Sequence, residues 1–125
     1  MTNKPKNKGR TEEHRTADSL NLISGWKAWR VPMSGALPGM AGDVILTSPD
    51  GHDFKVEVKI RKSGFKTLYK YLKYNEKTKR FRDDFLFVRE NRKPALVVMS
   101  EDTFAEILEH WQAGVVQAQE AKNAG

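Results

Sequence analysis

The chain contains no cysteine, and no stretch of it is apolar for long. The lack of cysteine excludes disulfides, zinc sites built on thiolates and cysteine nucleophiles, and it fits a reducing compartment. No apolar run approaches the roughly 20 residues that a membrane-spanning helix needs. We therefore expect a cytoplasmic protein without membrane association.

Charge is abundant and unevenly distributed over the 125 residues, whose formal net charge is +6. Residues 1–82 hold 18 Lys and Arg against 8 Asp and Glu, whereas residues 83–125 hold 4 against 8. A basic portion followed by an acidic one suggests a face that binds a polyanion such as nucleic acid. A solvated surface explains the same charges equally well. Charge therefore permits nucleic-acid binding without demonstrating it.

The length suits one compact domain. We expect residues 1–10 to form a flexible basic arm and residues 11–125 a single domain. Turn residues and hydrophobic spacing predict the element order α-β-β-β-α-β-β-α, a mixed α/β chain with a charged loop over 75–83. The predicted helices cover 11–24, 63–74 and the segment capped by Ser100, and the predicted strands cover 26–31, 43–47, 54–61, 85–89 and 95–99.

The first predicted helix carries an acid on its apolar side. Ala17, Leu20 and Ile23 are spaced to share one face. Glu13 precedes Ala17 by four residues and Leu20 by seven, so its side chain is expected on that inward face. A carboxylate at the start of a buried stripe needs a partner or a function. Glu13 is therefore a candidate site residue.

Two further acids are expected to meet across a hairpin. In the turn at 48–51, Pro49 presets φ and Gly51 can adopt a left-handed conformation, so paired residue numbers should sum to 100. Asp43 then lies directly opposite Glu57, with Cβ atoms about 4.5–5.5 Å apart. Lys59 follows Glu57 by two residues and points to the same side.

Opposed carboxylates repel each other unless a cation joins them. A hard divalent ion with oxygen ligands, most plausibly Mg²⁺, would remove that penalty. The three histidines are dispersed and offer no comparable zinc site. The alternative is that alternating Lys and Glu form an ordinary solvated strand face, because the pattern D…ExK also arises by chance. The hairpin by itself leaves both interpretations open.

The motifs in their order resemble the archaeal-type Holliday junction resolvases, a branch of the PD-(D/E)XK nuclease superfamily, and their phage-borne relatives. The superfamily usually has proline where this chain has Gly42. The resemblance runs over most of the chain, through Lys8-Gly9 and Glu13, Gly25-Trp26, Arg30-Val-Pro-Met-Ser34-Gly35, Gly42-Asp43-Val44, Val56-Glu-Val-Lys59, Leu86-Phe-Val-Arg89 and Ala95-Leu-Val-Val-Met99.

The resemblance implies a restriction-endonuclease-like core, in which helices flank a central mixed five-stranded sheet. It also implies a Mg²⁺-dependent endodeoxyribonuclease, with Mn²⁺ as a substitute ion. Asp43, Glu57 and the carbonyl of Val58 would ligate the metal, and Glu13 would complete its site. Lys59 would polarise the attacking water, and Ser34 would contact the phosphate or the metal.

The implied substrate is branched double-stranded DNA, above all the four-way junction, which a homodimer cuts by paired nicks. A related nuclease acting on other branched or damaged DNA, or a noncatalytic DNA-binding module of the same fold, are the alternatives. Basic residues next to the motifs are the candidates for contacts with backbone phosphates. They are Arg10, Arg30, Arg61, Lys62, Lys66 and Lys70.

Overall fold

The structure is a computed structural model that describes residues 5–31 and 43–124. The chain divides into two compact units, one formed by residues 1–60 with 108–125 and the other by residues 61–107. The single domain expected over 11–125 stays a prediction. Within the described residues, no helix is both long enough and apolar enough to cross a membrane.

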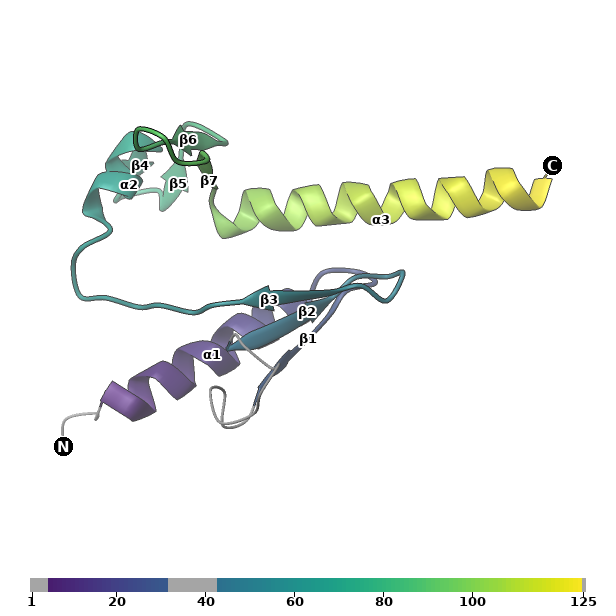
Figure 1. The fold of residues 1–125 in the computed structure, drawn as a ribbon, viewed down its shortest axis with the longest axis horizontal. Coiled ribbons are helices and arrows are strands. Elements are labelled where there is room, and N and C mark those ends of the chain that lie inside the picture. Colours follow the sequence, from purple (N-terminus) through teal and green to yellow (C-terminus); the bar gives the residue numbers. More distant parts are fainter. Residues whose placement is uncertain (1–4, 32–42, 125) are drawn as a thin grey trace. The chain divides into compact units, whose positions relative to one another are not determined.

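The first unit packs one helix on a small antiparallel sheet (Figure 1). The sheet has the strand order β1 (Lys27–Arg30), β2 (Val44–Thr47) and β3 (Asp53–Val56), and helix α1 (Pro5–Asn21) lies against β1 and β2. The helix begins six residues before the predicted start at Thr11, so part of the expected arm is helical. Proline favours a first helical position because it has no amide hydrogen to leave unpaired.

The core of this unit follows the predicted apolar stripe. Ala17, Leu20 and Ile23 are buried, as predicted, and Trp26 beside them is also buried. The ring of Trp26 lies between two other aromatic rings, with centroid distances of 6.2 Å to Phe54 and 5.1 Å to Trp111. Strand residues complete the buried set, which includes Ala28, Val31, Val44, Ile45 and Leu46.

The β2–β3 hairpin has the predicted turn and register. The amide of Ser48 donates to the carbonyl of His52 at 2.8 Å, and Gly51 has a φ of +89°. Four pairs, from Thr47–Asp53 to Val44–Val56, have numbers that sum to 100. Strand β3 nevertheless ends at Val56, five residues before the predicted end.

The second unit is built from short elements. Helix α2 (Lys66–Tyr71) is followed by the antiparallel pair β4 (Tyr74–Asn75) and β5 (Arg80–Phe81), and then by the pair β6 (Leu86–Val88) and β7 (Leu96–Val98). The β6–β7 pair confirms the two predicted strands. The expectation of a loop over 75–83 was wrong, because β4 and β5 form a hairpin there.

Helix α3 (Glu101–Ala124) starts in the second unit and ends in the first. Ser100 caps it as predicted, because its hydroxyl accepts a hydrogen bond from the amide of Thr103 at 3.1 Å. Leu108 is buried, and its carbonyl accepts the indole hydrogen of Trp26 at 3.3 Å. The helix continues through 117–124, where the sequence led us to expect fraying.

The fold is mixed α/β, but the expected five-stranded mixed sheet is not what the described residues form. Their strands make one three-stranded and two two-stranded sheets, and every pairing is antiparallel. The physical reason is that each short strand pairs with a strand that is its neighbour in sequence order. No described strand of the second unit pairs with β1, β2 or β3.

Candidate active site

The candidate site lies in the first unit, where the sheet loses its regular register at Asp43. This residue directly precedes β2 and joins both neighbouring strands through its backbone. Its carbonyl accepts the amide hydrogen of Val31 at 3.0 Å, and its amide donates to the carbonyl of Val56 at 2.9 Å. In the register of the hairpin, the partner of Asp43 would be Glu57. The hydrogen bond from the Asp43 amide therefore goes to Val56, which is one residue before that partner.

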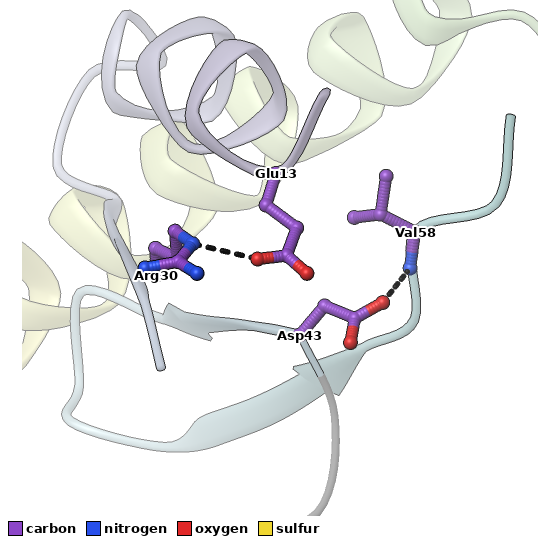
Figure 2. A network of polar contacts seen from close by, with 4 residues as sticks. All are labelled: Glu13, Arg30, Asp43 and Val58. Atoms are coloured by element: carbon purple, nitrogen blue, oxygen red, sulfur yellow. Dashed lines mark hydrogen bonds and ion pairs between the residues drawn. The ribbon is translucent and has the colours of Figure 1, made fainter. Parts of the chain in front are cut away.

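The side chain of Asp43 also departs from the regular hydrogen-bond pattern of the sheet. Its Oδ2 accepts the amide hydrogen of Val58 at 2.8 Å, so the carboxylate takes the place of a backbone carbonyl (Figure 2). The predicted direct opposition of Asp43 and Glu57 is absent from the paired positions, which end at Val44–Val56. The hydrogen bonds that Asp43 makes to Val56 and Val58 account for the difference.

Glu13 occupies the inward position that helix spacing predicted, with 15% of its side chain exposed. Its Oε2 accepts a hydrogen bond from Nε of Arg30 at 2.6 Å. Arg30 belongs to β1, and strand alternation places it on the same face as buried Ala28, toward α1. Because 23% of the Arg30 side chain is exposed, the pair is largely shielded from water and its attraction is weakly screened.

Backbone pairing brings these residues into one neighbourhood. Arg30 pairs with Val44, the residue after Asp43. Figure 2 shows the Glu13 carboxylate directed from α1 toward the sheet, with Arg30 on one side and Asp43 on the other. Helix α1, strand β1, the residue before β2 and the segment after β3 thus contribute Glu13, Arg30, Asp43 and Val58 in turn.

The other predicted catalytic residues do not join this group. Glu57 and Lys59 form an ion pair of 3.3 Å on the segment after β3, with 59% and 61% of their side chains exposed. This is the arrangement that the solvated-face interpretation predicts, and that interpretation stays open for the two residues. Ser34 lies outside the described residues.

The carboxylate oxygens near Asp43 are ligands of the type that a hard cation prefers, but few of them are present. Over residues 5–31 and 43–124, no three His, Asp or Glu side chains gather into a group that could hold a metal. Mg²⁺ in proteins usually keeps several waters and takes one or two carboxylates. A carboxylate has about four lone-pair sites, so an amide hydrogen bond does not prevent it from ligating an ion. Glu13 and Asp43 therefore fit a partly hydrated ion.

The predicted DNA-contacting residues are divided between the two units. Arg10, on α1, is exposed, whereas Arg30 is partly buried against Glu13. The residues of the second unit are all exposed, as contacts to phosphates require; they are Arg61, Lys62, Lys66 and Lys70.

Two contacts within the candidate site escaped the sequence interpretation. The pairing of Glu13 with Arg30 had a usable signal, because Arg30 is two residues after the apolar Ala28 and should share its inward face. The bond from Val58 to the Asp43 carboxylate had none. It depends on where β3 ends, and the unbroken alternation through Arg61 concealed that end.

The amino-acid sequence was compared with models of known protein families, and it matches one of them over nearly its whole length. Residues 4–124 match the model of the family described as "Phage putative PDDEXK endonuclease". The chain belongs to this family. No curated protein and no solved structure matches it.

Membership of this phage PD-(D/E)XK endonuclease family confirms the superfamily and the phage relatives that the motifs indicated. It assigns the chain to nucleases, which are hydrolases that act on nucleic acid, with DNA as the implied substrate. Members of this superfamily typically use divalent metals. The match does not extend to the archaeal-type junction resolvases.

Proposed function

We propose that this protein is a structure-specific endonuclease that hydrolyses phosphodiester bonds in branched DNA, with the four-way junction as its preferred substrate. The observation that carries the nuclease chemistry is the convergence of Glu13 and Asp43 from separate elements, each held by a hydrogen bond of 2.8 Å or less. The family supports cleavage of nucleic acid. The choice of branched DNA is supported by the resemblance of the motifs to junction resolvases.

Asp43, Glu13, Glu57 and the carbonyl of Val58 would hold Mg²⁺, with Mn²⁺ as a substitute. The ion, when bound, supplies positive charge that neutralises the phosphoryl oxygens and acidifies water. The Val58 amide holds the carboxylate of Asp43 in one orientation, and Arg30 does the same for Glu13. Such positioning before substrate arrives lowers the cost of reaching the transition state.

Lys59 would bring its ammonium group to the phosphate and stabilise the charge that develops there. Its side chain is 61% exposed, so a polyanion in solution can reach it. Contact with phosphate would replace the exposed ion pair to Glu57, which contributes little stability. Release of Glu57 from Lys59 would also make that carboxylate available as a ligand.

Contacts to backbone phosphates position DNA without reading its bases, which suits an enzyme that selects shape. A homodimer would place two sites on the symmetry-related strands of a junction. A noncatalytic DNA-binding module of the same fold is the alternative from a different class. A binding module would have no need of the acids, yet the chain retains Glu13, Asp43, Glu57 and Lys59 together.

The test incubates wild type, Asp43→Asn and Asp18→Asn with labelled four-way junction and linear duplex, in Mg²⁺, Mn²⁺ or EDTA. Asp18 is an exposed acid of α1 and serves as a control for loss of one negative charge. We expect wild type and Asp18→Asn to cut the junction in Mg²⁺ or Mn²⁺, and Asp43→Asn to lose at least about 100-fold in rate.

Equal cutting of junction and duplex would rule out the preference for branched DNA. Cutting that survives Asp43→Asn, or that proceeds in EDTA, would remove the proposed site. DNA binding without cutting of any substrate would favour the noncatalytic module.

A further inference from the structure

The β4–β5 hairpin of the second unit is strongly basic. We call residues 73–82 the basic hairpin: they hold five Lys and Arg against one acid, Glu76. None of them was among the predicted DNA contacts, which were chosen because they lie next to the motifs in the sequence. The structure gives it a defined turn, two distinct faces and a hollow.

The turn is held by the side chain of Asn75. Its Oδ1 accepts the amide hydrogens of Lys77 at 2.9 Å and Thr78 at 3.1 Å. The backbone then closes, because the amide of Lys79 donates to the carbonyl of Asn75 at 2.8 Å. Asparagine is favoured at the start of such turns for this reason. The cations of the turn are therefore presented on a fixed backbone.

One face of the hairpin is aromatic and anchors it to α2. Tyr74 and Phe81 are cross-strand partners with ring centroids 4.8 Å apart. Tyr69 of α2 contacts both, at 5.4 Å from Tyr74 and 5.8 Å from Phe81. Aromatic pairs at these separations stabilise beyond the area that they bury. This face is thus occupied by packing within the unit.

The opposite face is basic. Asn75 and Arg80 are cross-strand partners, and strand alternation turns them away from Tyr74 and Phe81. The amide of Arg82 donates to the carbonyl of Lys73 at 3.2 Å and continues the same register. A hollow of about 340 Å³ lies beside these cations and is bordered by Phe81 as well, and its lining contains three cations and no acid: Lys73, Asn75, Thr78, Arg80, Phe81 and Arg82.

A neighbouring hollow shows the contrast. It has about 480 Å³ and is bordered by Lys79 and Arg80, but three acids, Asp83, Asp84 and Asp102, line it as well. Three carboxylates would repel an anion there. The smaller hollow therefore favours an anionic ligand, and the acidic one beside it does not.

The cations of this face are only partly neutralised by the protein. Lys73 pairs with Asp83 at 2.7 Å. Neither Arg80 nor Arg82 forms an ion pair with any residue in the described parts of the chain. Like charges that share one face of a hairpin repel each other, so the arrangement costs stability until an anion binds.

Two lysines of the basic hairpin occupy left-handed positions that the fold needs, because Lys73 follows the C-cap of α2 and Lys79 closes the turn. Lys73 and Lys79 have φ values of 58° and 60°, in the left-handed region that favours glycine or asparagine. Lysine at these positions places a cationic side chain where glycine would adopt the backbone conformation at lower free energy. Such outliers point to a use for the side chain.

We propose that the basic hairpin is a DNA-binding surface, on which Arg80 and Arg82 bind the phosphodiester backbone with Lys77 beside them. This inference rests on the proposed function, because the nuclease family makes DNA the polyanion that the protein meets. Guanidinium groups bind phosphate through paired N–H donors, and phosphate contacts carry no base information. The surface would therefore hold DNA of any sequence.

The test measures binding of a labelled four-way junction by fluorescence anisotropy at 50–200 mM salt (a range of about fourfold) in EDTA. Binding in EDTA is independent of cleavage, so a failure of the nuclease assignment would not affect the result. The variant is Arg80→Ala with Arg82→Ala. The control, Arg89→Ala with Lys93→Ala, removes two exposed cations at the β6–β7 hairpin of the same unit. A third protein, Arg80→Lys with Arg82→Lys, keeps the charge.

We expect the double alanine variant to bind roughly tenfold more weakly at 100 mM salt, and its plot of log affinity against log salt to flatten by about 2. The control should lose much less, and the lysine variant should keep the wild-type salt slope. Unchanged melting temperatures establish that all proteins are folded. An equal loss in the control, or an unchanged slope in the alanine variant, would overturn the proposal. Tighter, hairpin-dependent binding of RNA duplex would overturn DNA as its ligand.

Discussion

The end of the sheet and the candidate site both depend on Asp43. Its amide, carbonyl and carboxylate have partners on three segments, namely Val56, Val31 and Val58. Only the carboxylate contributes negative charge. A substitution that keeps an acceptor oxygen in place therefore separates the charge of Asp43 from its structural role.

Asp43→Asn should leave the free energy of unfolding within about 0.5 kcal/mol of wild type, because the amide oxygen can accept the bond from Val58. Asp43→Ala should cost about 1 kcal/mol or more, because the half-buried amide of Val58 loses its acceptor. Urea unfolding measures both. Equal losses in the two variants would show that this bond does not stabilise the fold.

The ion pair between Glu13 and Arg30 is largely shielded from water, so we expect it to contribute measurably to the free energy of unfolding. Arg30→Ala should cost about 1–3 kcal/mol, because it leaves a largely buried carboxylate without its donor. A double-mutant cycle with Glu13→Gln should give a coupling of about 1 kcal/mol.

The matched control for that cycle is Glu12–Arg15 on the same helix, which is 3.5 Å apart with 75% of the Arg15 side chain exposed. Its coupling should be near zero, since exposed ion pairs contribute little. Equal coupling in the two cycles would mean that burial does not set the strength of the Glu13–Arg30 pair.

At the scale of elements, local signals predicted the structure wherever the cause was local. The turn at Gly51 and the cap at Ser100 appear as predicted, since neighbouring residues determine both. The end of β3 at Val56 could not be predicted, because it depends on Asp43, which is distant in sequence. The β4–β5 hairpin was missed because its strands are two residues each and too short to show alternation.

Two glycines give predictions of opposite sign from the same substitution. Nothing lies within 4 Å of a Cβ built at Gly51 or at Gly114, so packing is not a factor. Gly51→Ala should destabilise by about 1 kcal/mol, because the φ of +89° disfavours a side chain. Gly114→Ala should stabilise by about 0.5–1 kcal/mol, because alanine is the better helix former in α3.

Thermal unfolding of the two variants under one condition compares them directly. Stabilisation by Gly51→Ala would contradict the hairpin geometry. Destabilisation by Gly114→Ala would indicate that α3 is not helical at that position in solution.

At the scale of the whole molecule, the sequence predicted the chemistry better than the architecture. Order and spacing of motifs indicated the superfamily, and the family match confirms it. The number of sheets is not indicated in that way, since strand pairing across the chain leaves little mark on a single sequence. The five-stranded sheet came from the resemblance alone.

Binding of a divalent ion should stabilise the folded protein as a whole. An ion that binds only the native state at ten times its dissociation constant adds about 1.4 kcal/mol, which raises the melting temperature by a few degrees. We expect this rise with Mg²⁺ or Mn²⁺ in wild type and in Asp18→Asn, and its loss in Asp43→Asn. A rise that persists in Asp43→Asn would place the ion elsewhere.

The proposed homodimer makes a prediction that only the assembled molecule can test. If each subunit of 14.3 kDa cuts one strand, a dimer of one wild-type and one Asp43→Asn subunit has a single competent site. Mixed dimers, isolated through two different affinity tags, should nick one strand of a junction and leave the symmetry-related strand intact. Wild-type dimers should cut both strands. Sedimentation at the mass of a single chain, with both strands still cut, would contradict the dimer, because one site would then have acted twice.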